Sequence, residues 1–195
     1  MNVTVFEAIN ITKKYRNTLA LNQVSMSVMQ GDIYGFIGEN GAGKTTMIRL
    51  LTGLAEPTTG KIALFGESNK KLAKQRDRIG CIIESPSLYL DMTAYENLEV
   101  QRLQRGIPGK GCIDNALALV GLKDTGKKKA KDFSLGMRQR LALAIALLGN
   151  PEFLVLDEPI NGLDPTGIIE LRNLLKRLNK ERGITILISS HILTE

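Results

Sequence analysis

The sequence predicts an α/β fold that combines an antiparallel β region at the N-terminus, a mostly parallel core sheet and an inserted helical lobe. Three observations lead to this prediction. Residues 3–30 alternate between apolar and polar side chains, as half-buried strands do. Short apolar runs recur at residues 33–38, 153–156 and 184–189, and such runs suit parallel strands buried on both faces. Apolar residues at helical spacing occupy the segments between these runs.

The length and composition favour one folded domain over residues 1–195. Hydrophobic residues make up 43% of the chain and charged residues 24%, so neither disorder nor a fibrous repeat is indicated. We expect the core to comprise residues 1–85 and 136–195, and the helical lobe to comprise residues 86–135.

The N-terminal third predicts two strands followed by a strand, a loop and a helix. A polar break at residues 13–17 separates the first two strands and predicts an antiparallel pair. The apolar run that follows leads into a Gly-rich stretch. A helix is expected after it, because Met47, Ile48 and Leu51 repeat at helical spacing.

The last predicted helix spans residues 165–182. Asp164 is a good N-cap, Pro165 suits the first turn, and Gly183 can end the helix.

The lobe is predicted to contain two helices and a polar loop. Thr93 and Glu96 match a capping box that opens the first helix. The second is marked by Ile113, Ala116, Leu117 and Val120. Residues 123–132 are expected to form a polar loop.

Several classes of protein are excluded by residue counts. Cys81, Cys112 and His191 are too few for a zinc cluster or a disulfide framework, which favours a reducing cytosol. The longest apolar stretch, residues 141–149, is far shorter than the roughly 18 residues that span a bilayer. The N-terminus lacks the build of a signal peptide, so we expect no export of this chain.

The Gly-rich stretch matches the phosphate-binding loop pattern and lies between a predicted strand and a predicted helix, as that pattern requires. Its backbone N–H groups and the helix N-terminus favour phosphate, Lys44 can reach the terminal phosphates, and the Thr45 hydroxyl can bind Mg²⁺. The alternative is an ordinary Gly-rich turn. The residues expected to bind ATP here are Gly38, Glu39, Asn40, Gly41, Ala42, Gly43, Lys44, Thr45 and Thr46.

Two carboxylates follow the apolar run at residues 153–156. Asp157 and Glu158 would lie at the carboxyl end of a buried strand, where ligands of open α/β sheets bind. We expect Asp157 to bind Mg²⁺ and Glu158 to orient or deprotonate the attacking water. A solvated turn is the alternative, and the phosphate loop argues against it.

Together with these motifs, the segment FSLGMRQRL at residues 133–141 resembles the signature of ATP-binding-cassette (ABC) transporter subunits. The resemblance runs over essentially the whole chain and implies that Ser134 and Gly136 bind the γ-phosphate of a partner subunit's ATP. Ser134 would also cap a helix over residues 135–149. Leu135 and Met137 replace the usual Gly and Gln.

Three further positions are assigned by the same resemblance. Asp164, in the segment NGLDP, corresponds to the D-loop, although a purely structural cap is an alternative. Tyr15 resembles the aromatic residue that stacks on adenine, and the alternative is a core aromatic at a strand end. His191 resembles the switch histidine that contacts the γ-phosphate, where a structural or surface histidine is the alternative.

Glu84 occupies the position where the family usually has a glutamine that touches Mg²⁺. With a glutamate at this position, the chain resembles a subset of the family, the transporters that export bacitracin and lantibiotic peptides. A carboxylate is a stronger Mg²⁺ ligand than an amide and adds negative charge near the phosphates. We therefore expect Glu84 to affect both catalysis and coupling.

The resemblance implies an ATPase that cleaves ATP to ADP and phosphate. It would act as a head-to-tail homodimer or pseudo-symmetric heterodimer around two ATP molecules and drive an integral-membrane permease from the cytoplasmic face of the membrane. The alternative is a soluble ABC-type ATPase of DNA repair or translation. No long heptad insertion, zinc cysteines or second phosphate loop supports it, and we expect no nucleic-acid partner.

The charge is unevenly distributed. The net charge is +6, and residues 69–140 carry 15 Lys plus Arg against 8 Asp plus Glu. In the family that the chain resembles, the helical lobe faces the permease subunits and lies near the anionic inner leaflet, which would account for this excess without nucleic acid. We therefore expect Lys70, Lys71 and Lys74 to support docking. Because the chain stops at Glu195, four residues after His191, we also expect C-terminal elements of the family fold to be missing.

Overall fold

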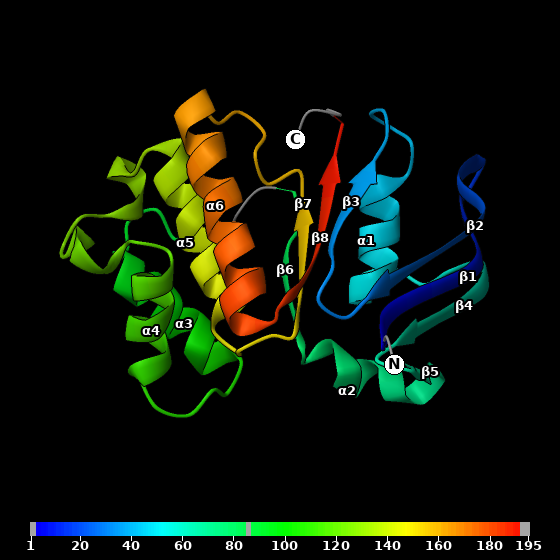
Figure 1. The fold of residues 1–195 in the computed structure, drawn as a ribbon, viewed down its shortest axis with the longest axis horizontal. Helices are drawn as coiled ribbons and strands as arrows, with labels where there is room; N and C mark the ends of the chain where they lie inside the picture. Colours follow the sequence, from blue (N-terminus) through cyan, green and yellow to red (C-terminus); the bar gives the residue numbers. More distant parts are fainter. Residues whose placement is uncertain (1–2, 85–86, 192–195) are drawn as a thin grey trace.

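The computed structural model describes residues 3–84 and 87–191 (Figure 1). The strands are β1 (Thr4–Tyr15), β2 (Thr18–Met29), β3 (Ile33–Ile37), β4 (Thr59–Leu64), β5 (Glu67–Ser68), β6 (Ile79–Ile82), β7 (Phe153–Asp157) and β8 (Thr185–Ser190). The α-helices are α1 (Lys44–Thr52), α2 (Leu72–Arg76), α3 (Ala94–Gln104), α4 (Gly111–Leu119), α5 (Leu135–Leu147) and α6 (Pro165–Arg182). Single 3-10 turns lie at Asn69–Lys71, Lys123–Thr125 and Ala130–Asp132.

The N-terminal strands form an antiparallel sheet of order β2-β1-β4-β5. β1 and β2 pair antiparallel, as predicted, and remain paired as far as Tyr15 and Thr18. The predicted polar break is therefore shorter than expected, because the chain turns at Arg16, which adopts a φ of 47°. The pairing of β4 and β5 with this sheet was not predicted.

The second sheet has the order β3-β8-β7-β6, and its neighbouring strands pair parallel. The predicted parallel core is therefore confirmed. Because the strands run in one direction, their carboxyl ends meet at one edge, where Asp157 of β7 lies opposite Ser189 of β8.

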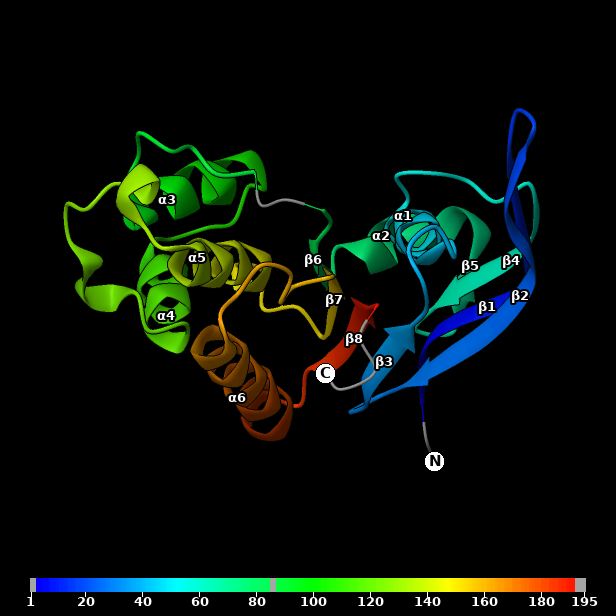
Figure 2. The same cartoon turned by 90° about the horizontal axis from the view of Figure 1, so that it is seen from above.

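Helix α1 lies between the two sheets (Figure 2). Its buried Met47 and Leu51 join a cluster with Phe6 of β1, and with Phe153 and Val155 of β7. The alternate residues of β7 belong to the cluster under α5 and α6 on the other face. A strand buried on both faces explains the unbroken apolar run in the sequence.

Helix α6 begins and ends at the predicted residues. The Asp164 side chain accepts a hydrogen bond from the Gly167 N–H at 3.1 Å, Pro165 opens the helix, and Gly183 ends it with a φ of 66°. These local signals fix where α6 begins, and therefore where the segment that leads from Glu158 to α6 ends. This segment borders the candidate site.

Helices α3 and α4 lie beyond α5, on the side away from the antiparallel sheet (Figures 1 and 2). The predicted capping box of Thr93 and Glu96 is present. Residues 123–132 form the expected irregular connection, anchored by the buried Ala130, whose N–H donates to Met92 O at 2.9 Å. The division into core and lobe stays a prediction, and residues 85 and 86 at its proposed boundary lie outside the described residues.

Candidate nucleotide-binding site

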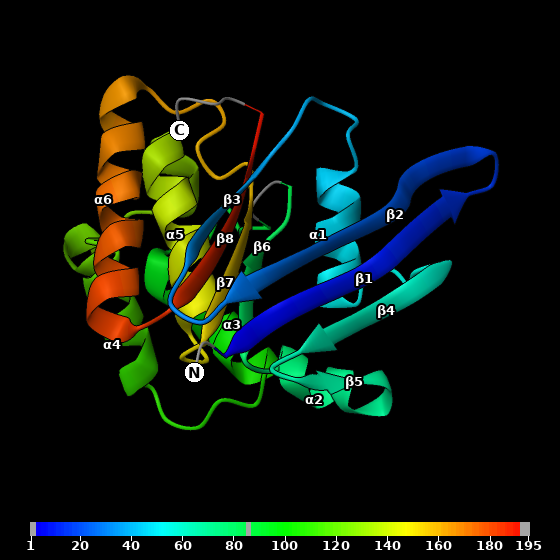
Figure 3. The same cartoon turned by 45° about the vertical axis from the view of Figure 1, so that its right-hand side comes forward.

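The Gly-rich stretch forms a loop between β3 and the N-terminus of α1, the arrangement that the phosphate-loop pattern requires (Figure 3). Gly41 and Gly43 have φ values of 86° and 91°. A Cβ on Gly43 would also lie 2.6 Å from Ala20 O, so glycine is required there on two counts. No side chain caps α1, which leaves its N-terminal N–H groups available to an anion.

Lys44 is the first residue of α1, and its side chain is only 5% exposed. Its ammonium donates to Gly38 O at 2.6 Å and to Glu39 O at 3.1 Å, so the side chain folds back under the loop. The same Nζ lies 3.4 Å from Glu158 Oε1. The positive charge is therefore held between the loop and the carboxyl edge of the sheet.

Asp157, at the end of β7, is 4% exposed and accepts two hydrogen bonds. Thr45 Oγ1 donates to its Oδ2 at 2.8 Å, and Ser189 Oγ donates to its Oδ1 at 2.5 Å. The hydroxyl of Thr45, in the first turn of α1, thus meets the carboxylate of Asp157 at the end of β7.

This pair of oxygen donors fits Mg²⁺, which takes oxygen ligands and is usually held by one or two carboxylates together with substrate phosphates. Over residues 3–84 and 87–191, no group of three or more His, Cys, Asp or Glu side chains gathers into a metal site. Two of the three predicted Mg²⁺ ligands, Thr45 and Asp157, thus lie within hydrogen-bond distance of each other.

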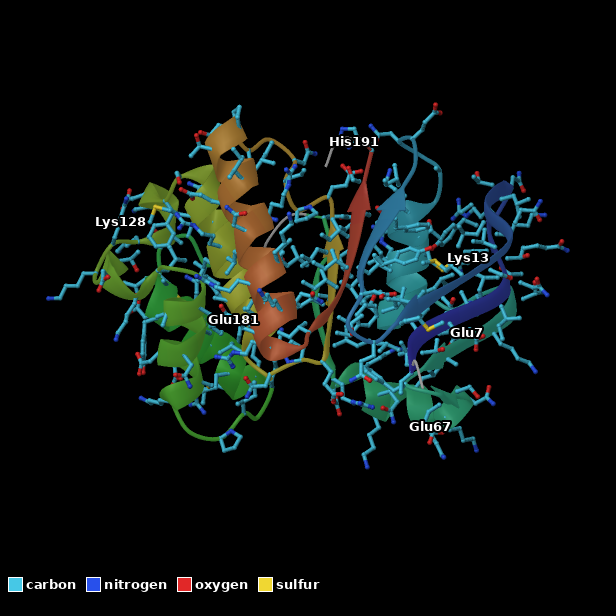
Figure 4. All side chains as sticks on the ribbon, in the orientation of Figure 1. Glu7, Lys13, Glu67, Lys128, Glu181 and His191 are labelled. Atoms are coloured by element: carbon cyan, nitrogen blue, oxygen red, sulfur yellow. The ribbon has the colours of Figure 1, made fainter. Side chains whose placement is uncertain are left out.

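Glu158 follows β7 in a left-handed backbone conformation, with a φ of 47°. Its N–H donates to Ser189 Oγ at 2.9 Å and to Ser189 O at 3.2 Å, which fixes the turn. Its Oε2 lies 3.3 Å from Nδ1 of His191, at the carboxyl end of β8 (Figure 4). A non-glycine residue in this conformation carries strain, and such strain is common at functional sites.

The structure thus brings Lys44, Thr45, Asp157, Glu158 and His191 together at one edge of the parallel sheet. This edge has an N–H-rich loop and an ammonium for phosphates, an oxygen pair for a divalent cation, and a carboxylate paired with an imidazole. The arrangement can bind a nucleoside triphosphate and direct a water at its terminal phosphate.

Glu84 follows β6 and pairs with Arg49 of α1. It also has a left-handed backbone, with a φ of 59°. None of the described contacts joins its carboxylate to Thr45 or Asp157, the other predicted Mg²⁺ ligands.

The signature and D-loop residues lie together at the start of α5 and α6. Ser134 caps α5 by accepting from Met137 N–H at 3.2 Å, as predicted. A Cβ on Gly136 would lie 3.9 Å from Leu163 Cδ2, so this glycine borders the D-loop. Leu135 is 49% exposed beside it, and the described contacts place Asp164 as the cap of α6.

Tyr15 lies at the end of β1 and is 41% exposed. Lys13 Nζ lies 4.7 Å from the ring centroid. The ring is therefore not buried in the core, in contrast to the alternative reading of this residue.

A model of the ABC transporter family matches residues 21–161. The chain belongs to the ABC transporter family. The bacitracin transport ATP-binding protein of Bacillus licheniformis is 52% identical over 193 residues, and the match covers 98% of this chain and 63% of the relative. The lantibiotic transport ATP-binding protein of Streptococcus pyogenes is 46% identical, with 95% and 80% covered. The predicted resemblance to these transporters is confirmed.

Solved ABC cassettes share the fold. A component of an ABC transporter complex from Clostridium perfringens superposes with a TM-score of 0.88 at 30% identity, covering 97% of this chain and 79% of that chain. A dimeric ATP-binding cassette bound to ADP and phosphate gives 0.82 at 27% identity, covering 97% and 89%. This ABC family chain spans only 63% and 62% of the length of two bacitracin relatives, the second from Enterococcus faecalis. No helix among the described residues has the length and hydropathy to span a bilayer.

Two site residues of this ABC family chain, Ser189 and Arg49, were not predicted from the sequence. A serine at the end of a buried strand gives a weak signal for Ser189, but its partner Asp157 depends on the pairing of β7 with β8. Arg49 lies four residues after Thr45, on the same face of α1, and that spacing is readable in the sequence. Its partner Glu84 is not readable, because the approach of β6 to α1 is tertiary.

Proposed function

We propose that the chain is the ATP-binding and ATP-hydrolysing subunit of a transporter that exports a peptide antibiotic or drug through a separate integral-membrane permease. The proposal is carried by the convergence of Lys44, Glu158 and His191 beside the uncapped N-terminus of α1. The relatives named for bacitracin and lantibiotic transport support the substrate class.

In the proposed reaction, the loop N–H groups and Lys44 bind the phosphates of ATP. A water held by Glu158 attacks the γ-phosphorus, its proton passes to the Glu158 carboxylate, and the bond to the β-phosphate oxygen breaks to give ADP and phosphate. His191 orients the Glu158 carboxylate and contacts the γ-phosphate. Mg²⁺ held by Thr45 and Asp157 would neutralise charge on the phosphates.

The proposed active form is a head-to-tail homodimer or pseudo-symmetric heterodimer at the cytoplasmic face of the membrane. Ser134 and Gly136 of each subunit would contact the ATP bound by the other, with Asp164 at the same interface. The half-exposed Leu135 at the start of α5 is consistent with a covered surface there, and a dimeric ABC cassette is among the similar structures. Stacking of the half-exposed Tyr15 on adenine belongs to the same proposal.

Glu158→Gln tests the proposal. The variant keeps the size and polarity of the side chain but cannot accept the water's proton, so ATP affinity should persist while turnover falls about a hundredfold or more. The ATP-bound dimer should then accumulate, as size-exclusion chromatography would detect. Glu181→Gln is the matched control: Glu181 is exposed on α6 (Figure 4), and its removal should leave turnover unchanged.

The same pair of variants tests transport. In cells that carry the cognate permease, the wild type and Glu181→Gln should raise the tolerated bacitracin concentration, and Glu158→Gln should not. Persistent turnover in Glu158→Gln would refute Glu158 as the base. Active ATPase without any effect on tolerance would refute the substrate class.

A further inference from the structure

Arg49 and Glu84 form an ion pair that no motif in the sequence accounts for. The guanidinium Nη2 of Arg49, in the last turn of α1, contacts Oε1 of Glu84 just past the end of β6. The side chains are 42% and 59% exposed, so water reaches both. An exposed pair contributes little to global stability, and its significance must lie in where it holds the carboxylate.

The position of the pair is set by helix spacing. Thr45 and Arg49 are four residues apart on α1, so their side chains share one face and lie one turn from each other. Thr45 hydrogen-bonds Asp157 at the end of β7, while Arg49 holds Glu84 at the end of the adjacent β6. One face of α1 therefore contacts the carboxylates of two neighbouring strands.

The strand register places Glu84 level with Glu158. Ile82 of β6 pairs with Leu156 of β7, and each glutamate follows two residues later. Both glutamates have left-handed backbones, with φ values of 59° and 47°. The carboxylate of Glu84 thus belongs to the same edge of the sheet as the candidate catalytic base, with Arg49 as its counter-charge.

We propose that Arg49, one helical turn after Thr45, is a positioning residue for Glu84: it neutralises this carboxylate and holds it, in competition with the divalent cation of the site. This inference rests on the proposed function, because it assumes that Mg²⁺ and nucleotide bind at Thr45 and Asp157. Arg49 thereby keeps the glutamate from adding a full negative charge beside the phosphates.

The competition has a measurable consequence. Any carboxylate shared between Arg49 and a cation binds the cation more weakly than a free carboxylate does, by the reciprocity of coupled equilibria. Arg49→Met should therefore lower the Mg²⁺ concentration needed for half-maximal tightening of a non-hydrolysable fluorescent ATP analogue, by about fivefold or more. Arg49→Lys, which retains the charge, should restore the wild-type value.

The effect should require Glu84. In the protein that already carries Glu84→Gln, adding Arg49→Met should leave the Mg²⁺ requirement unchanged. Lys71→Met, which removes the exposed pair with Glu67 far from the site, is the control and should match the wild type. An unchanged Mg²⁺ requirement in Arg49→Met, or an equal change with and without Glu84→Gln, would overturn the proposal.

A second measurement is independent of nucleotide. Because the pair is exposed, Arg49→Glu and Glu84→Arg should each lower the thermal unfolding midpoint only slightly, by placing like charges together, and the double variant should recover that small loss. Failure to recover would overturn the pair itself. If the wild type binds no nucleotide with or without Mg²⁺, the proposed function fails. The charge swap still shows whether Arg49 and Glu84 form an ion pair in solution.

Discussion

Ser189 determines how firmly Asp157 is held. Its hydroxyl donates to Asp157 Oδ1 at 2.5 Å and accepts from the Glu158 N–H at 2.9 Å. One buried side chain therefore orients the candidate Mg²⁺ ligand and fixes the turn that presents the candidate base. Partners of metal ligands commonly contribute tenfold to a hundredfold in metal affinity.

Ser189→Ala should weaken Mg²⁺-dependent nucleotide binding about tenfold, because Asp157 loses a hydrogen bond that aims it at Thr45. The loss should be read as the Mg²⁺ concentration for half-maximal nucleotide binding.

The matched control is Thr185→Val, which removes another buried hydroxyl of β8. Thr185 Oγ1 accepts from the Gly31 N–H at 3.0 Å, at the opposite end of the strand. Both variants should lower the free energy of unfolding by about 1 kcal/mol. An equal loss of Mg²⁺ affinity in both would trace the effect to general destabilisation and contradict the prediction.

At the scale of the element, the capping box of α3 links helix stability to pH. The backbone N–H and then the hydroxyl of Thr93 donate hydrogen bonds to Glu96, and these lower the pKa of its carboxyl group. A carboxyl group whose pKa is lowered by folding stabilises the native state above its unfolded pKa. That stabilisation disappears as the pH falls through the lowered folded pKa.

Thr93→Ala should therefore remove part of the loss of stability on acidification, because Glu96 loses the hydroxyl donor but keeps the backbone N–H, which is the larger cause of its lowered pKa. The readout is the urea midpoint followed from about pH 6 down to about pH 3. Hydrogen bonds from arginines also lower the pKa values of Glu99 and Glu152, so these two groups also make the wild type less stable in acid. Their contribution is the same in the variant, so the variant is compared with the wild type at each pH.

Thr125→Ala provides the control, since its hydroxyl donates to Leu122 O at 2.8 Å with no carboxylate partner. It should lower the urea midpoint equally at each pH. A pH profile of Thr93→Ala parallel to the wild type would contradict the role of the capping box.

Elements with local signals could be predicted from the sequence, and elements without them could not. α6 was predicted to its terminal residues, because Asp164, Pro165 and Gly183 each act within one turn. β4, β5 and α2 have no comparable caps or periodicity and are held by pairing and packing. β5 is only two residues long and exists because Glu67 and Ser68 pair with β4.

The candidate site follows the same division across the whole molecule. The phosphate loop and the two carboxylates after β7 could be predicted because each is a contiguous run beside a strand. Their convergence could not, since the order β3-β8-β7-β6 decides which strand ends meet. Asp157 with Ser189 and Arg49 with Glu84 are consequences of that order.

The charge distribution is also a property of the whole molecule. Residues 69–140 carry 15 Lys plus Arg against 8 Asp plus Glu, so positive charge is in excess there. Lys70 and Lys71 lie on the 3-10 turn after β5, and Lys74 lies on α2, all exposed. Lys71 pairs with Glu67 in an i,i+4 contact, and that glutamate lies on β5, the edge strand of the antiparallel sheet, away from His191 (Figure 4).

Replacing Lys70, Lys71 and Lys74 with glutamine should weaken assembly with the membrane permease, because an anionic membrane surface attracts nearby lysines by about fivefold in affinity for each. Co-purification with the permease from membranes is the measurement. ATP binding should be unaffected, since the three side chains are remote from the phosphate loop.

The control replaces Lys176, Lys180 and Arg182, three exposed cations of α6, with glutamine and so removes the same charge outside residues 69–140. Equal loss of assembly in both triple variants would reduce the effect to net charge, and unchanged assembly in the first would place the docking surface elsewhere.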